Sequence, residues 1–121
     1  MSTLEVSNLN DGTTTVATTF VTGGSAKSWC QWSGASSIRN SLNVSSITDV
    51  TTGSNTITYT TSFANDDYAQ GGMARENSSG ATAHMRLSTF ATSNTRYFCV
   101  DESGTSIDGE TQMVVVQGDM A

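Results

Sequence analysis

Apolar and polar residues alternate in short stretches along most of the chain, and this period of two constrains the fold more than any other feature. Apolar side chains at every second position place one face of a β-strand in a core. Residues 82–90 are an example, because Ala83, Met85 and Leu87 alternate with polar residues. No stretch of ten or more residues shows the 3.6-residue apolar period of a helix. The sequence therefore predicts an all-β fold.

Turns rich in Gly, Ser, Thr and Asn separate the stretches that we predict as strands. These stretches are residues 14–21, 27–32, 43–49, 54–62, 68–74, 82–90, 96–102 and 113–116. Strands at intervals of about 8 to 12 residues are typical of sandwiches. We expect a compact antiparallel β-sandwich or jelly-roll-like domain of eight or nine short strands. Gly53 is expected to take a positive φ in a hairpin turn, Gly71-Gly72 to break a strand, and residues 77–80 to form a turn.

Two of the predicted strands carry large apolar side chains whose directions follow from the alternation. In the first, Trp29 and Trp32 point to opposite faces, so they cannot form one sugar-binding platform and at least one belongs to the core. In the last, the run Val114, Val115 and Val116 makes the strand apolar on both faces. Such a strand is expected at the centre of a sheet or at a contact between copies of the chain.

Residues 1–22 are polar and rich in Thr, and Gly23-Gly24 follows them. We interpret residues 1–22 as an extended N-terminal arm that could dock onto another protein, and residues 23–121 as the sandwich domain. Within the arm, Val16 and Phe20 are expected on one face of a strand and are candidate contact residues.

Large apolar side chains are scarce in this sequence. Leu, Ile, Val and Phe together number 21 of 121 residues, whereas Ser and Thr number 38. A domain of this size buries roughly two-thirds of its unfolded surface, so much of its core must consist of small and hydroxyl-bearing side chains. Contact with further copies of the same chain would bury more apolar surface. We therefore expect the chain to oligomerise.

The formal net charge is −6, with five Lys or Arg residues against eleven Asp or Glu residues. Nucleic acids and anionic membranes are bound by clustered cations, so the composition argues against both partners. The first eleven residues contain no basic or apolar run, and no window approaches the ~20 apolar residues of a membrane span. The sequence predicts neither a signal peptide nor membrane insertion.

Carboxylates are the first candidates for catalytic or metal-binding chemistry. Asp66-Asp67 and Asp101-Glu102 are adjacent pairs, whose side chains point to opposite faces of a strand and do not form an acid–base couple. Residues 101–110 hold four carboxylates without the spacing of a calcium-binding loop. We interpret all of them as turn or edge charges. We predict no catalytic residue, no metal ligand and no cofactor, and do not expect the chain to be an enzyme.

His84 is the only histidine, which leaves little for a multi-histidine metal centre or a catalytic triad within one chain. It shares the polar face of its predicted strand with Arg86, and we expect both at the surface or at an interface. A trimer axis would bring three copies of His84 together. Cys30 and Cys99 lie on predicted strands as buried thiols, and a disulfide between them is the alternative.

Two segments of the sequence are similar to a known family. Residues 23–29 read GGSAKSW and residues 38–49 read IRNSLNVSSITD, followed by a turn at 50–53 and a Thr-rich strand at 56–61. This pattern resembles a recurring domain of tail-fibre and related virion proteins of tailed bacteriophages, common in marine phages. The dense similarity covers residues 23–69. Trp32 stands where the family usually has Phe, and we expect no long fibre shaft of the kind that often precedes the domain.

The resemblance implies a virion structural protein of the phage tail or tail-fibre apparatus, found as a homotrimer. Its expected partners are copies of itself, other phage virion proteins and a host cell-surface glycan. The alternative is a capsid decoration protein or head fibre that stabilises the shell, because a short β-domain with a terminal arm suits that role. The candidate assembly or contact residues are Val16, Phe20, Trp29, His84, Arg86, Val114, Val115 and Val116.

Overall fold

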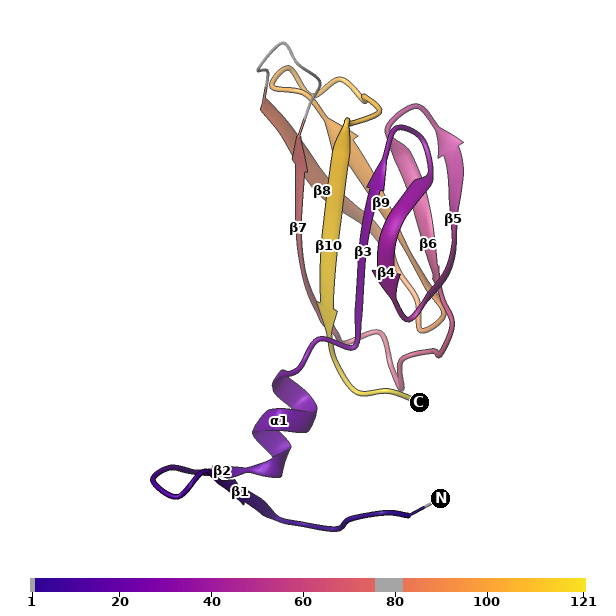
Figure 1. The fold of residues 1–121 in the computed structure, drawn as a ribbon. Coiled ribbons are helices and arrows are strands. Elements are labelled where there is room, and N and C mark those ends of the chain that lie inside the picture. Colours follow the sequence, from indigo (N-terminus) through magenta and orange to yellow (C-terminus); the bar gives the residue numbers. More distant parts are fainter. Residues whose placement is uncertain (1, 76–81) are drawn as a thin grey trace.

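The computed structural model describes residues 2–75 and 82–121. A β-rich body stands on a small N-terminal unit that contains the helix (Figure 1). The N-terminal unit consists of β1 (Asn8–Asn10), β2 (Thr15–Ala17) and α1 (Thr18–Gly24). The body consists of β3 (Ser28–Ser33), β4 (Ser37–Leu42), β5 (Val44–Thr51), β6 (Ser54–Tyr59), β7 (Ala69–Arg75), β8 (Thr82–Phe90), β9 (Asn94–Val100) and β10 (Thr111–Gln117).

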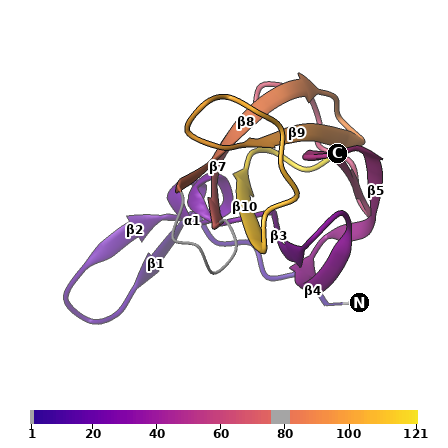
Figure 2. The same ribbon diagram turned by 90° about the horizontal axis from the view of Figure 1, so that it is seen from above.

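The strands of the body form one antiparallel sheet in the order β4-β3-β10-β7-β8-β9-β6-β5, which curls until it nearly closes into a barrel (Figure 2). β7 and β8 are joined by only two residue pairs, Ala74 with Ala83 and Arg75 with Thr82. The sheet therefore folds at this seam into two four-stranded layers, β4-β3-β10-β7 and β8-β9-β6-β5. The predicted all-β, sandwich-like fold is confirmed, and β10 is a central strand as expected.

The core lies between the two layers and follows the alternation in the sequence. On β3 every second residue is buried, so Trp32 is fully enclosed while Trp29 faces outward. The core cluster contains Cys30, Trp32, Ile57, Tyr59, Phe63, Tyr68, Tyr97, Val114 and Val116. Hydrogen bonds also join side chains within the core. The Thr95 hydroxyl lies 2.8 Å from the Tyr59 hydroxyl and 2.5 Å from the Tyr68 hydroxyl. Buried hydroxyls need such partners.

The predicted hairpin between residues 43 and 62 is confirmed as β5 and β6. Gly53 takes a φ of 71° in its turn, as expected. The turn is fixed to the loop after β9, because the Gly53 amide donates to an Asp108 carboxylate oxygen at 2.7 Å and the Cys99 amide donates to the Gly53 carbonyl at 2.7 Å.

The N-terminal unit differs from the extended strand predicted over residues 14–21. Only 15–17 form a strand, and Phe20 lies on α1, so the expected strand face shared by Val16 and Phe20 does not exist. Hydroxyl groups stabilise this local structure, since Thr22 donates to the Thr18 carbonyl at 3.0 Å and Thr18 donates to the Val6 carbonyl at 2.9 Å. Gly23-Gly24 form the end of the helix, ahead of β3.

Gly71-Gly72 do not break a strand, contrary to the prediction. They lie inside β7, paired with Val115 and Val114 of β10. The ladder compensates for the weak strand propensity of glycine, and the Met85 sulfur lies over the space that a Gly72 side chain would occupy. The turn predicted at residues 77–80 lies outside the described residues.

Candidate assembly surface

The outer face of the β4-β3-β10-β7 layer carries a continuous set of apolar side chains. The strand registers place Leu42, Trp29 and Val115 side by side in one row across the layer. In the neighbouring row, Met113 of β10 lies opposite Met73 of β7. We call these five side chains the apolar face. They come from four strands, so the sheet register brings together residues that are far apart in the sequence.

The apolar face is open to solvent in the single chain. Met73 is 70% exposed, and Leu42, Met113 and Val115 are each more than 40% exposed. A shallow hollow of about 400 Å³ runs between β7 and β10, lined on the outer side by Gly71, Met73, Met113 and Val115. The hollow is open at Gly71 because glycine has no side chain to fill it. Contiguous exposed apolar surface of this kind marks interaction sites in soluble proteins.

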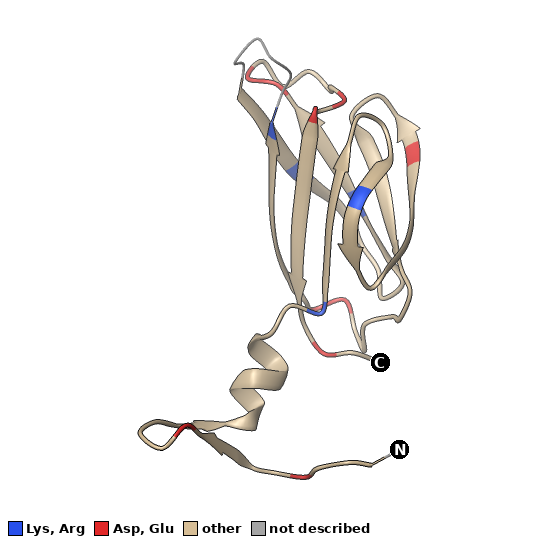
Figure 3. Cartoon of the chain, viewed as in Figure 1, with Lys and Arg blue, Asp and Glu red and all other residues tan. Residues whose placement is uncertain are grey.

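Charged residues lie around the apolar face and not within it. In Figure 3 the middle of β10, β3 and β7 is uncoloured, with charges at the strand ends and on the edge strand β4. Arg75 at the upper end of β7 pairs with Glu110 at 3.5 Å, and both side chains are exposed. An apolar centre with a charged rim is the usual anatomy of a protein–protein interface.

The contact residues that the sequence indicated do not all lie on one surface of the structure. Trp29 and Val115 are paired on the apolar face, whereas Val114 and Val116 point inward and are core residues, 3% and 0% exposed. The sequence analysis missed Leu42, Met73 and Met113. The alternation of Met113 with Val115 on β10 was the available signal for one of them.

The remaining predicted contact residues lie elsewhere. His84 and Arg86 are exposed on the outer side of β8, in the other layer. Val16 and Phe20 belong to the N-terminal unit, where Phe20 is 75% exposed. These four residues therefore do not join the apolar face within one chain.

The N-terminal unit, although mostly polar, also exposes several apolar side chains. None of the residues of α1 is buried, and an open hollow of about 460 Å³ is lined by Leu9, Val16 and Val21 together with polar residues. At its base, the Gln117 side chain donates to the Gly24 carbonyl at 2.9 Å, and the Lys27 amide donates to the Val116 carbonyl at 2.9 Å. These bonds hold the unit below the lower end of the body (Figure 1).

The titratable groups with altered pKa values have structural roles. The backbone amides of Thr14 and Thr13 lower the pKa of Asp11 in the turn between β1 and β2. The hydroxyl of Ser103 and the amide of Thr105 lower the pKa of Asp101 in the same way. These bonds bind both carboxylates into local turns.

Burial raises the pKa of the Cys30 thiol to about 11, so the thiolate that a nucleophile needs is disfavoured there. Cys99 is buried as well, and the structure contains no disulfide between the two. Among the residues that the structure describes, no group of three or more His, Cys, Asp or Glu side chains could hold a metal ion.

Comparison of the chain with protein-family models, with curated proteins and with solved structures found no match. In the described ranges, none of the helices has both the length and the apolar character needed to cross a membrane. The arrangement of the surface is therefore the main structural basis for a functional proposal.

Proposed function

We propose that this chain is a non-enzymatic structural protein of a bacteriophage virion, part of the tail or the tail-fibre apparatus, that acts by assembling into a homotrimer. The observation that carries the proposal is the apolar face on the β4-β3-β10-β7 layer. Such a surface gains free energy when another protein covers it, at roughly 25 cal/mol for each Å² of apolar area removed from water. The similarity of residues 23–69 to tail-fibre domains supports a virion role.

A copy of the same chain is the partner best suited to the apolar face. The core is small and rich in hydroxyl groups, so burial between copies adds to a modest internal stability. The face itself carries no charge, so the net charge of −6 on each copy is not concentrated at the contact.

The upper end of the body provides the surface for contacts with a host glycan or the next virion protein. There the loop from Asp101 to Glu110 is fixed by the bond between Asp108 and Gly53, and by a bond from the Ile107 amide to the Cys99 carbonyl at 3.0 Å. Its hydroxyl groups can donate and accept hydrogen bonds. A preorganised polar loop loses little conformational entropy when it binds.

A capsid decoration protein is the second candidate, and the N-terminal unit favours it. A compact body with a unit projecting from one end, as in Figure 1, is suited to clamping a neighbouring shell protein, and α1 of that unit has no buried residues. Phe20 is the most exposed apolar side chain of that unit's helix.

Gold-labelled antibody against this chain on intact phage particles tests the proposal and separates the two candidates. We expect label at the tail in negative-stain micrographs. Label over the head would make the chain a decoration protein. Absence of label from particles that other virion antibodies do label would contradict both.

A further inference from the structure

The seam between β7 and β8 is incomplete in the single chain. β7 pairs with β10 over seven residue pairs and β8 pairs with β9 over six, but β7 and β8 share only two. Beyond these two pairs the strands diverge, and in Figure 1 β8 runs diagonally away from β7. Residues 69–73 and 84–90 therefore have no ladder pairing across the seam. Sheet edges of this kind accept an added strand.

A cavity of about 170 Å³ lies behind the open part of the seam. Gln70 and Gly72 of β7 line one side, and Met85, Leu87 and Tyr97 of the other layer line the opposite side. Gly72 adds no side chain to the cavity, and the Met85 sulfur lies 3.2 Å from the position that a Cβ of Gly72 would take. Apolar cavities of about 150 Å³ hold a benzene molecule, so this one has room for a branched aliphatic side chain.

One polar atom at the seam lacks a partner. The Gln70 side-chain oxygen accepts a hydrogen bond from the Tyr97 hydroxyl, which orients the amide, but the buried Gln70 Nε2 has no hydrogen-bond partner in the structure. A buried donor that is left without an acceptor destabilises the fold. A backbone carbonyl on an added strand would satisfy it, so the seam fits an extended peptide with aliphatic side chains on one face.

The chain itself contains such a peptide, residues 2–7 before β1. Leu4 and Val6 are apolar and two residues apart, so in an extended strand they share one face, opposite Glu5. Leu4 is 83% exposed and Val6 is 43% exposed, and the segment belongs to no strand of its own chain. This is the pattern of a half-buried strand that lacks its sheet.

The charges also agree with a strand at the seam. If Leu4 and Val6 point into the cavity, Glu5 points outward. His84 and Arg86 of β8 are exposed on that outer side and would lie beside it. A carboxylate on a strand next to Arg86 is attracted to the Arg86 guanidinium. The chain has only five Lys and Arg residues, so it offers few other cations to a neighbouring carboxylate.

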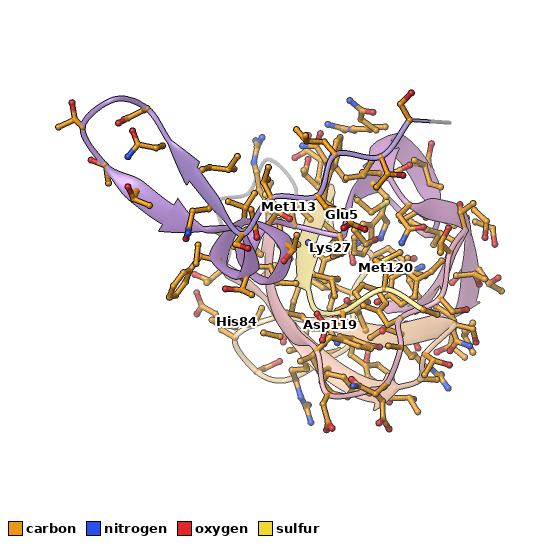
Figure 4. The ribbon with its side chains drawn as sticks, turned by 90° about the horizontal axis from the view of Figure 1, so that it is seen from below. Glu5, Lys27, His84, Met113, Asp119 and Met120 are labelled. Carbon is orange, nitrogen blue, oxygen red and sulfur yellow. The ribbon has the colours of Figure 1, made fainter. Side chains whose placement is uncertain are left out.

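The segment is positioned to reach a neighbouring copy. Viewed from below (Figure 4), Glu5 lies on the segment that passes beneath the body, whereas His84 lies on the flank. The bonds from Gln117 and to Val116 hold the base of the N-terminal unit below the body. We propose that residues 2–7 of one copy add as a strand between β7 and β8 of the next copy, with Leu4 or Val6 in the cavity. This inference rests on the proposed self-assembly and adds a second contact between copies to the one at the apolar face.

Disulfide trapping between two differently tagged chains tests the inference. One chain carries Leu4→Cys, and the other carries Met85→Cys or Leu87→Cys, which allows for two registers of the added strand. Both chains also carry Cys99→Ser, because Met85 lies opposite Cys99 on β9 and a thiol at position 85 could otherwise pair with it. We expect a crosslinked heterodimer after mild oxidation, because side chains opposite each other on paired strands bring their Cβ atoms to about 5 Å. The matched control is Glu5→Cys, which presents its thiol on the other face and should crosslink at least ten-fold less.

The outcomes separate this contact from self-assembly in general. A heterodimer formed by Leu4→Cys and not by Glu5→Cys supports the inference. Equal crosslinking by both, or no crosslinking in an oligomer of unchanged size, overturns the inference and leaves the proposed assembly standing. A single chain that carries both cysteines could instead form a disulfide between its own residue 4 and its own residue 85 or 87. That result would mean that the chain's own N-terminal segment occupies the seam, and it would overturn the contact with a second copy. A wild-type chain that stays monomeric overturns both.

Discussion

Gly53 shows how one residue joins two parts of the body. Its positive φ turns the chain from β5 into β6, and its amide and carbonyl bond to the loop after β9 and to Cys99. The approach is so close that a Cβ at this position would lie 2.6 Å from the Cys99 carbonyl oxygen and 2.7 Å from the Ile107 amide nitrogen. The sequence predicts the turn, because Gly follows a strand pattern, but the second contact is visible only in three dimensions.

Gly53→Ala should destabilise the fold by several kcal/mol, because it combines an unfavourable φ with overlap against backbone atoms. Gly104→Ala is the matched control. Gly104 also has a positive φ, of 84°, but a Cβ there meets nothing within 4 Å, so its cost should stay near 1–2 kcal/mol. Urea denaturation of both variants measures the difference. Equal losses of stability would contradict the close packing around Gly53.

Cys30 should make the folded state sensitive to alkaline pH. Its folded-state pKa of about 11 lies above the ordinary value of 9.0, so the unfolded chain loses this proton first as the pH rises. The contribution of the protonated Cys30 thiol to the free energy of unfolding is complete below about pH 9. It falls between pH 9 and about pH 11, by up to about 1.4 kcal/mol for each pH unit. Cys30→Ala should lower stability at pH 7 and flatten its decline between pH 9 and 10. Denaturation series at several pH values measure this, and an unchanged decline would contradict the assignment.

At the scale of elements, the sequence predicts β3, β6 and β10 well because each is rich in strand-forming residues and buries one face, with every second residue buried along β3 and β10. It misses β4, which has only two apolar residues, Ile38 and Leu42, and whose pairing with β3 shifts register between Gln31 and Trp32. It also misses α1, which is too short to show a helical period and consists of residues with little helix propensity. Local hydrogen bonds of Thr18 and Thr22 decide that structure.

The N-terminal unit should be dispensable for folding but not for assembly into particles. Deletion of residues 1–22 removes no buried side chain of α1 and leaves every strand of the body intact. The midpoint of thermal unfolding should therefore change by only a few degrees. The truncated chain should no longer incorporate into phage particles, which an immunoblot of purified particles measures. Normal incorporation, or loss of the folded body, would contradict the role of this unit as a docking arm.

At the scale of the whole molecule, the apolar face and the N-terminal unit are uncovered surfaces of one small protein. The members of the apolar face could not be identified from the sequence, because Leu42 and Met73 become neighbours of Trp29 and Met113 only through pairing of strands that are distant in the chain. The scarcity of large aliphatic residues is the sequence feature from which we predict self-association. The surface proposed for it could be identified only from the registers of the sheet.

Sedimentation equilibrium of the full chain tests the central claim, that the apolar face drives assembly of copies, most directly. The account predicts a trimer of 12.7 kDa chains for the wild type, and a monomer for the double variant Val115→Lys and Met73→Lys. Both positions are exposed, so the folded β-spectrum should persist. Thr48→Lys, at an exposed site on β5, is the control and should stay trimeric. A wild-type chain that remains monomeric, or a double variant that still forms trimers, would contradict the account.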